Sequence, residues 1–252
     1  MPLKLLLRFE TEKPIKLSQL KPKVAHGIVF SFFKDSPEVG ELLHRGGIKP
    51  FSISINSHFR YPEREVKRFG IVFNLLDNSL YPKISRFFLG CGEFTVGGVK
   101  AEFSSVKPLE VETYSAVLEK AEPSRDILMD FLSPTAFKRG SFDYPLPEPK
   151  LLFSNLLKKW NAFSPVKFNE EFYRKLPKLL TVSGCWIKTR KVEVMDVAKF
   201  TGFTGRVLFY ATGEGEELRA LNALVRFAEF AGVGRKTTMG FGSVRVPREV
   251  VK

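Results

Sequence analysis

The sequence is poor in the residues that build metal centres and disulfide frameworks. It contains only two cysteines, Cys91 and Cys185, and three histidines, His26, His44 and His58. Neither set has the spacing of a zinc site, and two cysteines are too few for a disulfide-rich scaffold. We therefore expect a protein that uses no metal and no other cofactor, and that works in a reducing cytoplasm.

Long apolar segments are also absent. The opening residues MPLKLLLRFE contain an apolar run that is too short for a secretory signal, and charged residues follow it directly. No stretch approaches the roughly 20 consecutive apolar residues that a membrane-spanning helix needs. We therefore expect no membrane partner.

Basic residues, by contrast, are abundant. The chain has 40 Lys and Arg against 27 Asp and Glu, which gives a formal net charge of +13 and an isoelectric point near 9.7. Because each basic side chain that meets a phosphate releases counterions, this excess favours a nucleic-acid partner over general solubility charge. The 25 Phe and 6 Tyr residues mostly build cores, and an exposed minority would stack on bases.

The hydrophobic pattern of the first half predicts the element order β-α-β-β-α-β. The predicted elements are strands at Leu3–Phe9, Phe51–Ile55 and Val66–Leu76, helices at His26–His44 and Leu80–Leu89, and a hairpin at Phe94–Val106 around Gly97-Gly98. This is the order of a ferredoxin-like domain.

The same order repeats in the second half, after a mixed stretch at Val111–Ser124 that suits a strand and a connector. The predicted elements are strands at Arg125–Leu132, Leu179–Val194, Thr204–Thr212 and Gly240–Val246, and helices at Pro149–Ala162 and Glu216–Phe230. The sequence therefore predicts an α+β fold of two tandem ferredoxin-like domains, residues 1–118 and 119–252, with a glycine-rich loop near the C-terminus.

That glycine-rich segment, GVGRKTTMGFG at residues 232–242, is the most specific motif of the chain. Its glycines permit a positive φ and a close backbone approach, and successive amides after a helix can form an anion-binding concavity. A dinucleotide fingerprint needs glycine where Thr237 stands, and a P-loop string is absent. A helix C-cap followed by a glycine-rich hairpin is the structural alternative. We predict RNA contacts from Gly232, Gly234, Arg235, Lys236, Thr237, Thr238, Gly240 and Gly242.

Two Gly-apolar-Gly triplets around five residues at the C-terminus resemble a signature of the repeat-associated mysterious protein superfamily of CRISPR systems. Leu42–Ser54, read LLHRGGIKPFSIS, and Phe131–Thr135, read FLSPT, are similar to segments of the sixth Cas family, whose members cleave CRISPR precursor RNA. The resemblance spans nearly the whole chain. It implies a metal-independent endoribonuclease in which a 2′-hydroxyl attacks the adjacent phosphate and leaves a 2′,3′-cyclic phosphate. The implied partners are CRISPR repeat RNA and other CRISPR effector subunits, with the chain as a monomer or homodimer.

The resemblance also implies catalytic roles for His44 and Lys49. An imidazole titrates near neutral pH and suits acid–base work, and Lys49 matches a transition-state-stabilising lysine of relatives. The structural alternative for His44 is a solvent-facing residue at a helix C-terminus. Some relatives carry a tyrosine where this chain has Phe30, which cannot transfer a proton. Either His44 works with Lys49 alone, or Tyr61 or His26 substitutes, or the chain binds RNA without cutting it.

Further basic residues in the second half are candidate RNA contacts. These are Lys138 and Arg139 in a turn after the opening strand, and Lys188, Arg190 and Lys191 at the tip of a long hairpin. Lys158 and Lys159 are predicted to lie on a solvated helix face. His26 is predicted to start the first helix, and His58 to lie in a polar loop. Three alternatives to the nuclease remain: an inactive RNA-binding homologue, a structural effector subunit, and an unrelated RNA binder, although no RNP1 string is present.

Overall fold

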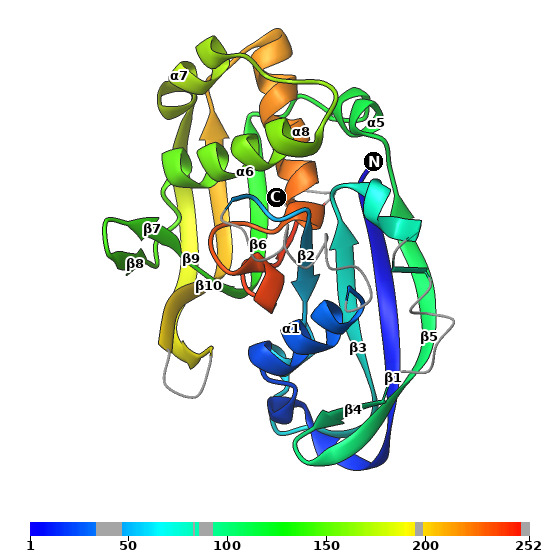
Figure 1. The fold of residues 1–252 in the computed structure, drawn as a ribbon. Coiled ribbons are helices and arrows are strands. Elements are labelled where there is room, and N and C mark those ends of the chain that lie inside the picture. The colour runs from blue at the N-terminus through cyan, green and yellow to red at the C-terminus, as the bar shows by residue number, and fades with distance from the viewer. Residues whose placement is uncertain (34–46, 83, 86–92, 195–198, 248–252) are drawn as a thin grey trace.

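Two antiparallel sheets, each covered by helices, make up the protein (Figure 1). The computed structural model describes residues 1–33, 47–82, 84–85, 93–194 and 199–247. No helix in these ranges is both long and apolar enough to cross a membrane. The α+β class and the tandem ferredoxin-like arrangement predicted from the sequence are confirmed.

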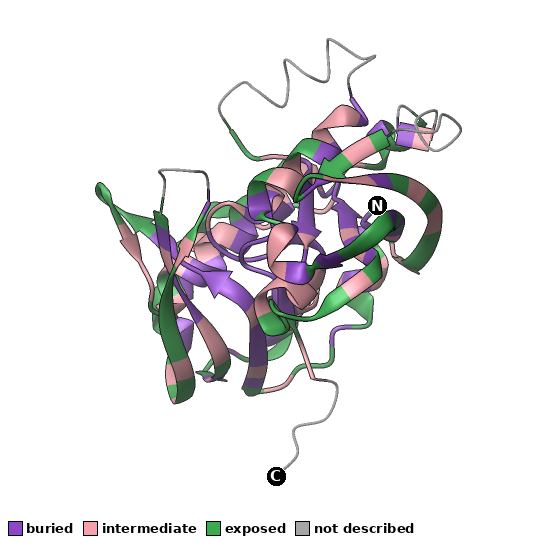
Figure 2. Cartoon of the chain, turned by 90° about the horizontal axis from the view of Figure 1, so that it is seen from below, coloured by how far each residue is buried: buried purple, intermediate pink, exposed green. Residues whose placement is uncertain are grey.

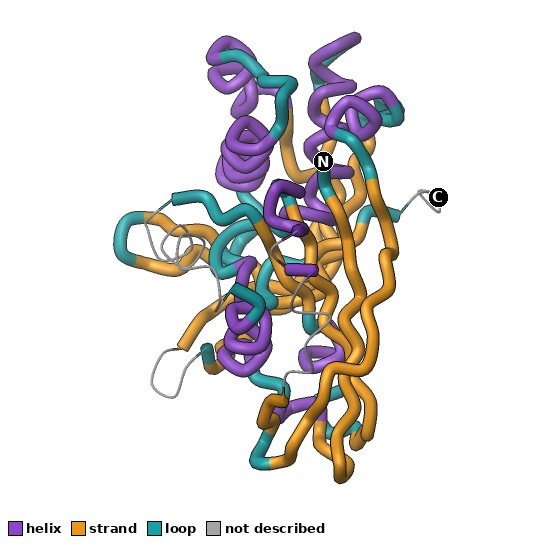
Figure 3. The backbone as a smooth tube through the Cα atoms, turned by 45° about the vertical axis from the view of Figure 1, so that its right-hand side comes forward, coloured by secondary structure: helices purple, strands orange, loops and turns teal. Residues whose placement is uncertain are grey.

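The first sheet has the strand order β2-β3-β1-β5-β4. Its strands are β1 (Leu3–Lys16), β2 (Phe51–Ser54), β3 (Glu65–Leu75), β4 (Glu93–Val96) and β5 (Val99–Val111). Apolar residues alternate along β1, so that Leu5, Leu7 and Phe9 are buried on one face beneath α1 (Pro22–Ser31). The predicted turn at Gly97-Gly98 is confirmed, because both glycines have the positive φ that a tight hairpin requires. Figure 3 shows these strands running along one side of the molecule.

The second sheet has the order β11-β6-β10-β9. Its strands are β6 (Asp126–Thr135), β9 (Leu180–Glu193), β10 (Lys199–Ala211) and β11 (Val244–Arg245), and it is covered by α6 (Pro149–Phe163), α7 (Glu170–Leu179) and α8 (Gly215–Ala231). A hairpin of β7 (Phe137–Arg139) and β8 (Phe142–Tyr144) follows β6. Without β4, each sheet has the 4-1-3-2 order of a ferredoxin-like fold. The remaining short helices are η1 (Leu17–Gln19), α3 (Asn56–Arg60), η2 (Asn78–Leu80), α5 (Tyr114–Glu119) and η3 (Thr237–Met239).

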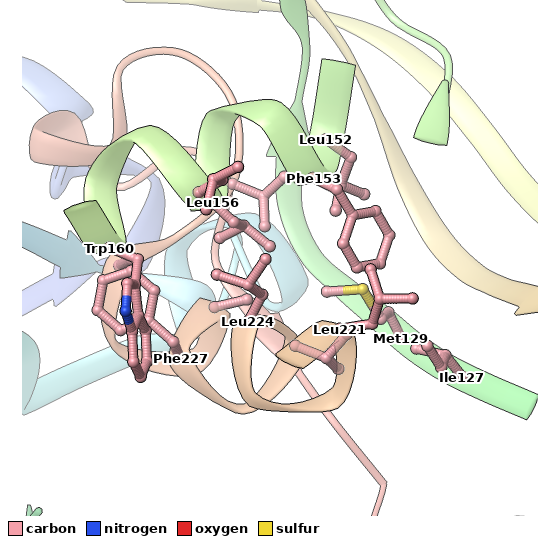
Figure 4. Packing of buried hydrophobic residues seen from close by; sticks show 14 of the residues in the cluster. Ile127, Met129, Leu152, Phe153, Leu156, Trp160, Leu221, Leu224 and Phe227 are labelled. Atoms are coloured by element: carbon pink, nitrogen blue, oxygen red, sulfur yellow. The ribbon is translucent and has the colours of Figure 1, made fainter. Parts of the chain in front are cut away.

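The core of the second unit forms where α6 and α8 pack on β6 (Figure 4). Trp160 of α6 lies edge-on to Tyr114 and Phe227, with ring centroids 5.1 and 5.3 Å away. Its indole nitrogen donates to the Val166 carbonyl over 2.7 Å, which satisfies the polar group of a fully buried ring. Helical spacing of apolar residues in the sequence predicted both helices correctly.

Several predicted elements differ from the structure. Val111–Ser124 contains α5 rather than a strand, because Thr113 accepts a hydrogen bond from the Ala116 amide and caps a helix. The helix α7, capped by Asn169, was not predicted. The closing strand predicted at Gly240–Val246 is reduced to Val244–Arg245, since its glycines belong to the preceding loop.

The predicted helices of the first half are only partly described. The helix expected from His26 begins earlier, at Pro22, because proline is well suited to a first helical position. It runs to Ser31, and the remainder of the predicted range lies outside the described residues. Residues 81–82 and 84–85 are helical, in agreement with the start of the helix predicted at Leu80–Leu89.

The expected boundary between residues 118 and 119 falls inside α5. Tyr114 and Val117 of this helix belong to the hydrophobic core of the second unit. We therefore propose that the second unit begins at Tyr114.

Buried polar side chains join the two units. Ser52 of β2 donates to the Phe230 carbonyl near the end of α8 over 2.5 Å, and it accepts from the Asn74 amide over 2.9 Å. Ser54 donates to the Ser243 hydroxyl over 3.0 Å. In Figure 2, seen from below, buried residues gather at the centre of the molecule and exposed ones on the outer strands.

Ser52→Ala is expected to lower the free energy of unfolding by about 1–3 kcal/mol, because the Asn74 amide and the Phe230 carbonyl lose a buried partner. The measurement is chemical denaturation followed by circular dichroism. Ser183→Ala is the matched control, since its hydroxyl is exposed, and should change stability by less than about 0.5 kcal/mol. Equal midpoints for both variants would contradict the role of this junction.

Candidate nucleic-acid interface

The glycine-rich loop, residues 232–242, lies at the junction of the two units, against β2 and α1 of the first (Figure 1). Its glycines are required by close packing. A Cβ on Gly240 would lie 2.6 Å from Ile55 Cγ1, and a Cβ on Gly242 would overlap the Val233 carbonyl oxygen. Both residues also have a positive φ, so any side chain there would add backbone strain.

Many amides of the loop donate to acceptors inside the protein. The Val233 amide donates to the Gly242 carbonyl over 2.8 Å, and the Gly234 amide to Asn155 Oδ1 over 3.0 Å. The Arg235 amide donates to the Ala136 carbonyl, also over 3.0 Å. These amides are therefore not available to an anion, and the loop presents its side chains instead.

Lys159 of α6 holds the loop from beneath. Its Nζ donates to the Ala231 and Gly232 carbonyls over 3.0 and 2.9 Å, and lies 3.5 Å from Thr237 Oγ1. The prediction of a solvated face is wrong for this residue, which is only 8% exposed, whereas Lys158 is exposed. Lys159 follows the buried Leu156 by three positions, so the two side chains lie on the same side of α6.

Burial lowers the pKa of Lys159 to about 7. The carbonyls at the C-terminal end of α8 provide the acceptors that the ammonium group needs, and a helix C-terminus favours a positive charge. Thr237 is buried beside it, so its hydroxyl faces the interior of the loop.

Arg235 and Lys236 differ in their surroundings. The Arg235 guanidinium pairs with Asp143 of β8, which links the loop to the β7–β8 hairpin. Lys236 has a left-handed φ of 58° and is half-buried. Burial and the neighbouring Arg235 charge lower the pKa of Lys236.

The β7–β8 hairpin brings Lys138 and Arg139 close to this loop, and both are exposed. The Arg139 guanidinium lies 5.2 Å from the Tyr144 ring centroid, a cation–π contact. Because Asp143 on the same hairpin binds Arg235, the predicted basic turn and the loop form one surface.

Of the two histidines that the structure describes, His26 faces the loop. It lies inside α1 rather than at its start, so that prediction is wrong. Its Nδ1 lies 2.8 Å from the Thr238 carbonyl oxygen, and its ring centroid is 4.1 Å from that of Phe30. Of the two groups that could substitute for a tyrosine at Phe30, His26 is the one placed against the glycine-rich loop.

The other candidates are distributed around the first unit. His44 lies outside the described residues. Lys49 is half-buried and lies two residues before β2. His58 contacts the Leu17 carbonyl through Nδ1 over 3.0 Å, and burial lowers its pKa, which indicates a structural role. Tyr61 follows α3 and is exposed, with the Arg60 guanidinium 5.2 Å from its ring.

The basic residues of β9 do not all share one surface. Lys188, Arg190 and Lys191 are exposed. Because side chains alternate along a strand, Lys188 and Arg190 lie on one face and Lys191 on the other.

A cavity of about 450 Å³ lies between α1 and the end of β9, where Lys21 pairs with Glu193 over 3.4 Å. Its lining includes Val24 and Gly27 of α1 and Phe94 of β4. Within the part of the chain that the structure describes, no three His, Cys, Asp or Glu side chains are grouped as metal ligands.

Comparison with known proteins finds similarity to one family, mainly in the second half of the chain. Residues 129–244 match the family model described as CRISPR-associated endoribonuclease Cas6. A Cas6 endoribonuclease of Mycobacterium tuberculosis is 28% identical over 155 residues, which are 58% of this chain and 48% of the relative. One of Streptococcus thermophilus is 22% identical over 149 residues, 56% of this chain and 61% of the relative. The chain therefore spans about half to three-fifths of the length of these curated relatives.

Solved structures extend the likeness to nearly the whole chain. A Cas6 product complex is 29% identical, with a TM-score of 0.78 over 98% of this chain and 99% of the other. Thermus thermophilus Cas6 is 25% identical, with a TM-score of 0.73 over 98% of both chains. Residues 129–244 thus match the Cas6 family, and nearly the whole chain shares the fold of solved Cas6 proteins.

The matched residues include the part of the candidate site that lies in the second unit. The family match ends at Val244, so it contains the glycine-rich loop, α6 and the β7–β8 hairpin. A Cas6-related protein of Pyrococcus furiosus, 15% identical with a TM-score of 0.58, shares the fold.

Lys159 should make stability depend on pH. Its folded-state pKa of about 7 lies below that of an unfolded lysine, near 10.4, so the unfolded chain binds more protons between these values. The free energy of unfolding contributed by Lys159 should therefore rise with pH above about 7, by up to about 1.4 kcal/mol per unit.

Lys159→Met and Lys158→Met separate this effect from other titrations, because the two lysines are neighbours on α6 and differ in burial. Urea denaturation at pH 7, 8 and 9 should give a wild-type stability that rises relative to Lys159→Met and stays parallel to Lys158→Met. Parallel pH profiles for all three proteins would show that Lys159 is not a buried titrating group.

Proposed function

We propose that this protein is a Cas6-family endoribonuclease that cleaves CRISPR precursor RNA within its repeats, without a metal ion. The observation that supports this most directly is the position of His26. It lies against the glycine-rich loop, which carries Arg235 and Lys236. The relatives named as endoribonucleases, and a relative solved as a product complex, agree with this proposal.

RNA binding falls to side chains around the loop. Lys236 and Thr238 are partly exposed on the loop, and Lys138 and Arg139 continue the surface on the β7–β8 hairpin. Each positive charge that meets a phosphate contributes by counterion release. The remaining predicted positions, Gly232, Gly234, Thr237, Gly240 and Gly242, shape the loop, and Arg235 fixes it to the hairpin through Asp143.

The chemistry needs a base and an acid. A base removes the proton of the 2′-hydroxyl, whose oxygen attacks phosphorus while the bond to the 5′-oxygen of the next nucleotide breaks. An acid protonates that leaving oxygen, so the products are a 2′,3′-cyclic phosphate and a 5′-hydroxyl. We assign these two roles to His44 and His26, and charge stabilisation of the phosphorane-like transition state to Lys49.

The environment of His26 suits proton transfer. When its Nδ1–H donates to the Thr238 carbonyl, Nε2 becomes the basic nitrogen of the neutral ring. The same hydrogen bond ties the ring orientation to the loop that holds the RNA. His26 therefore takes the role of the tyrosine that some relatives carry at the position of Phe30.

The second candidate function is RNA binding without cleavage, and the Phe30 side chain favours it. In that case the same surface holds repeat RNA for other CRISPR effector subunits. The two functions differ only in the formation of a cyclic phosphate, so a product assay separates them.

His26→Ala and His44→Ala should each lower the cleavage rate of a labelled CRISPR-repeat RNA by about 10²–10⁴-fold in excess EDTA, because each removes a proton-transfer group. The rate is measured at saturating protein, with the product end identified as a 2′,3′-cyclic phosphate. His58→Gln is the matched control, since this histidine is bound to the Leu17 carbonyl, and it should retain the wild-type rate. Tight binding without cutting by the wild type would favour the second function.

A further inference from the structure

A row of polar and aromatic side chains crosses the second sheet on the face away from α6 and α8. Strand pairing places Arg245 of β11 opposite Asp130 of β6, Asp130 opposite Arg206 of β10, and Arg206 opposite Trp186 of β9. Residues paired in register lie on the same face, so these four side chains are neighbours across all four strands. The candidate site described above does not use them.

The two arginines in the row share one carboxylate. Arg206 Nε lies 2.8 Å from Asp130 Oδ1, and Arg245 Nη2 lies 2.6 Å from Oδ2. Burial opposes ionisation of Asp130, but the hydrogen bonds from Arg206 and Arg245 outweigh it and lower its pKa. The Asp130 side chain is 10% exposed and the arginines are 51% and 60% exposed, so a ligand meets guanidinium groups and not the carboxylate.

Trp186 stands at the end of this row and is 62% exposed. The edge of its ring lies close to Gly184, where a Cβ would approach Cη2 to 2.6 Å, so the absence of a side chain at Gly184 makes room for the indole. The rest of the ring is largely open to solvent. Such an exposed indole is a suitable platform for a nucleobase.

The surroundings of the row extend it toward the glycine-rich loop. A hollow of about 620 Å³ is lined by Trp186, Arg206, Arg245 and Asp130. Along β9 the same face continues with Lys188 and Arg190. On β10, Phe200 belongs to this alternation, and its ring centroid lies 4.6 Å from that of Phe241 in the loop.

We propose that this face is a second RNA-binding site for an unpaired stretch of the RNA, in which a base stacks on Trp186 and a phosphate lies between Arg206 and Arg245. This second site depends on the proposed function in one respect, which is that the ligand is RNA. The basic residues of this region outnumber its single carboxylate, Asp130, since they are Arg245, Arg206, Lys188 and Arg190. This excess of positive charge suits a polyanion.

The test uses a fluorescein-labelled oligouridylate of about eight nucleotides, which has no secondary structure and fits the size of known single-strand sites. Binding should quench the emission of the exposed Trp186, while Trp160 is buried. Trp186→Ala should weaken binding by about 5–100-fold. Tyr81→Ala, which removes an exposed ring of the first unit, should bind as the wild type does.

The arginines are tested by salt dependence. Arg206→Gln and Arg245→Gln should each reduce the slope of log affinity against log salt by about 0.7, the value for one phosphate contact to a single strand. Trp186→Phe should retain most of the affinity and lose the quenching, which separates stacking from a general loss of structure.

Two results would overturn this second site. One is unchanged affinity for the oligouridylate in Trp186→Ala. The other is a Trp186→Ala variant that binds RNA as the wild type does but self-associates or binds proteins differently. That result would make the face a protein interface. If Trp186→Ala still binds and cuts repeat RNA as the wild type does, only the second site fails. If the wild type binds no repeat RNA, the proposed function itself fails.

Discussion

The end of α8 is the point on which the arrangement of the site depends. A helix that ends inside a protein leaves carbonyl groups that need partners, and here Lys159 supplies them from α6. The chain then turns at Gly232 into the glycine-rich loop. Because Ser52 of the first unit donates to the adjacent Phe230 carbonyl, the same helix end also fixes the two units to each other.

This junction explains why glycine recurs in the loop. The chain passes through a space bounded by Ile55 of one unit and Ala136 of the other, where a Cβ on Gly240 or Gly234 would collide. The loop is thus held by packing and hydrogen bonds, and its charged side chains are presented at a fixed place. A fixed array of positive charge beside an imidazole is what phosphodiester cleavage requires.

The sequence predicted the parts of the structure that depend on local pattern. Alternation along β1 and helical spacing in α6 and α8 predicted these elements, and Gly97-Gly98 predicted the hairpin, whereas α5 and α7 were missed. The role of Lys159 could not be read with confidence from two adjacent lysines, because its partners lie more than 70 residues away. The row of Trp186, Arg206 and Arg245 depends on strand register between segments far apart in the chain, which local periodicity does not encode.

For the loop amides, the sequence pattern predicted a binding role that the folded structure does not leave open. A run of glycines predicts an anion-binding concavity, yet the Val233, Gly234 and Arg235 amides are used by the protein itself. Glycine content reports backbone freedom, and the folded neighbours decide which groups remain for a ligand. The sequence named both Tyr61 and His26 as substitutes for the tyrosine, and only the folded position of His26 against the Thr238 carbonyl distinguishes the two.

Hydrogen–deuterium exchange with a repeat RNA whose attacking 2′-hydroxyl is replaced by hydrogen tests the central claim most directly, because this RNA binds without being cut. We expect slower exchange in residues 232–242, in α1 around His26 and in the β7–β8 hairpin. Protection confined to other surfaces, with unchanged exchange in the loop and α1, would contradict the assignment of this junction as the RNA site.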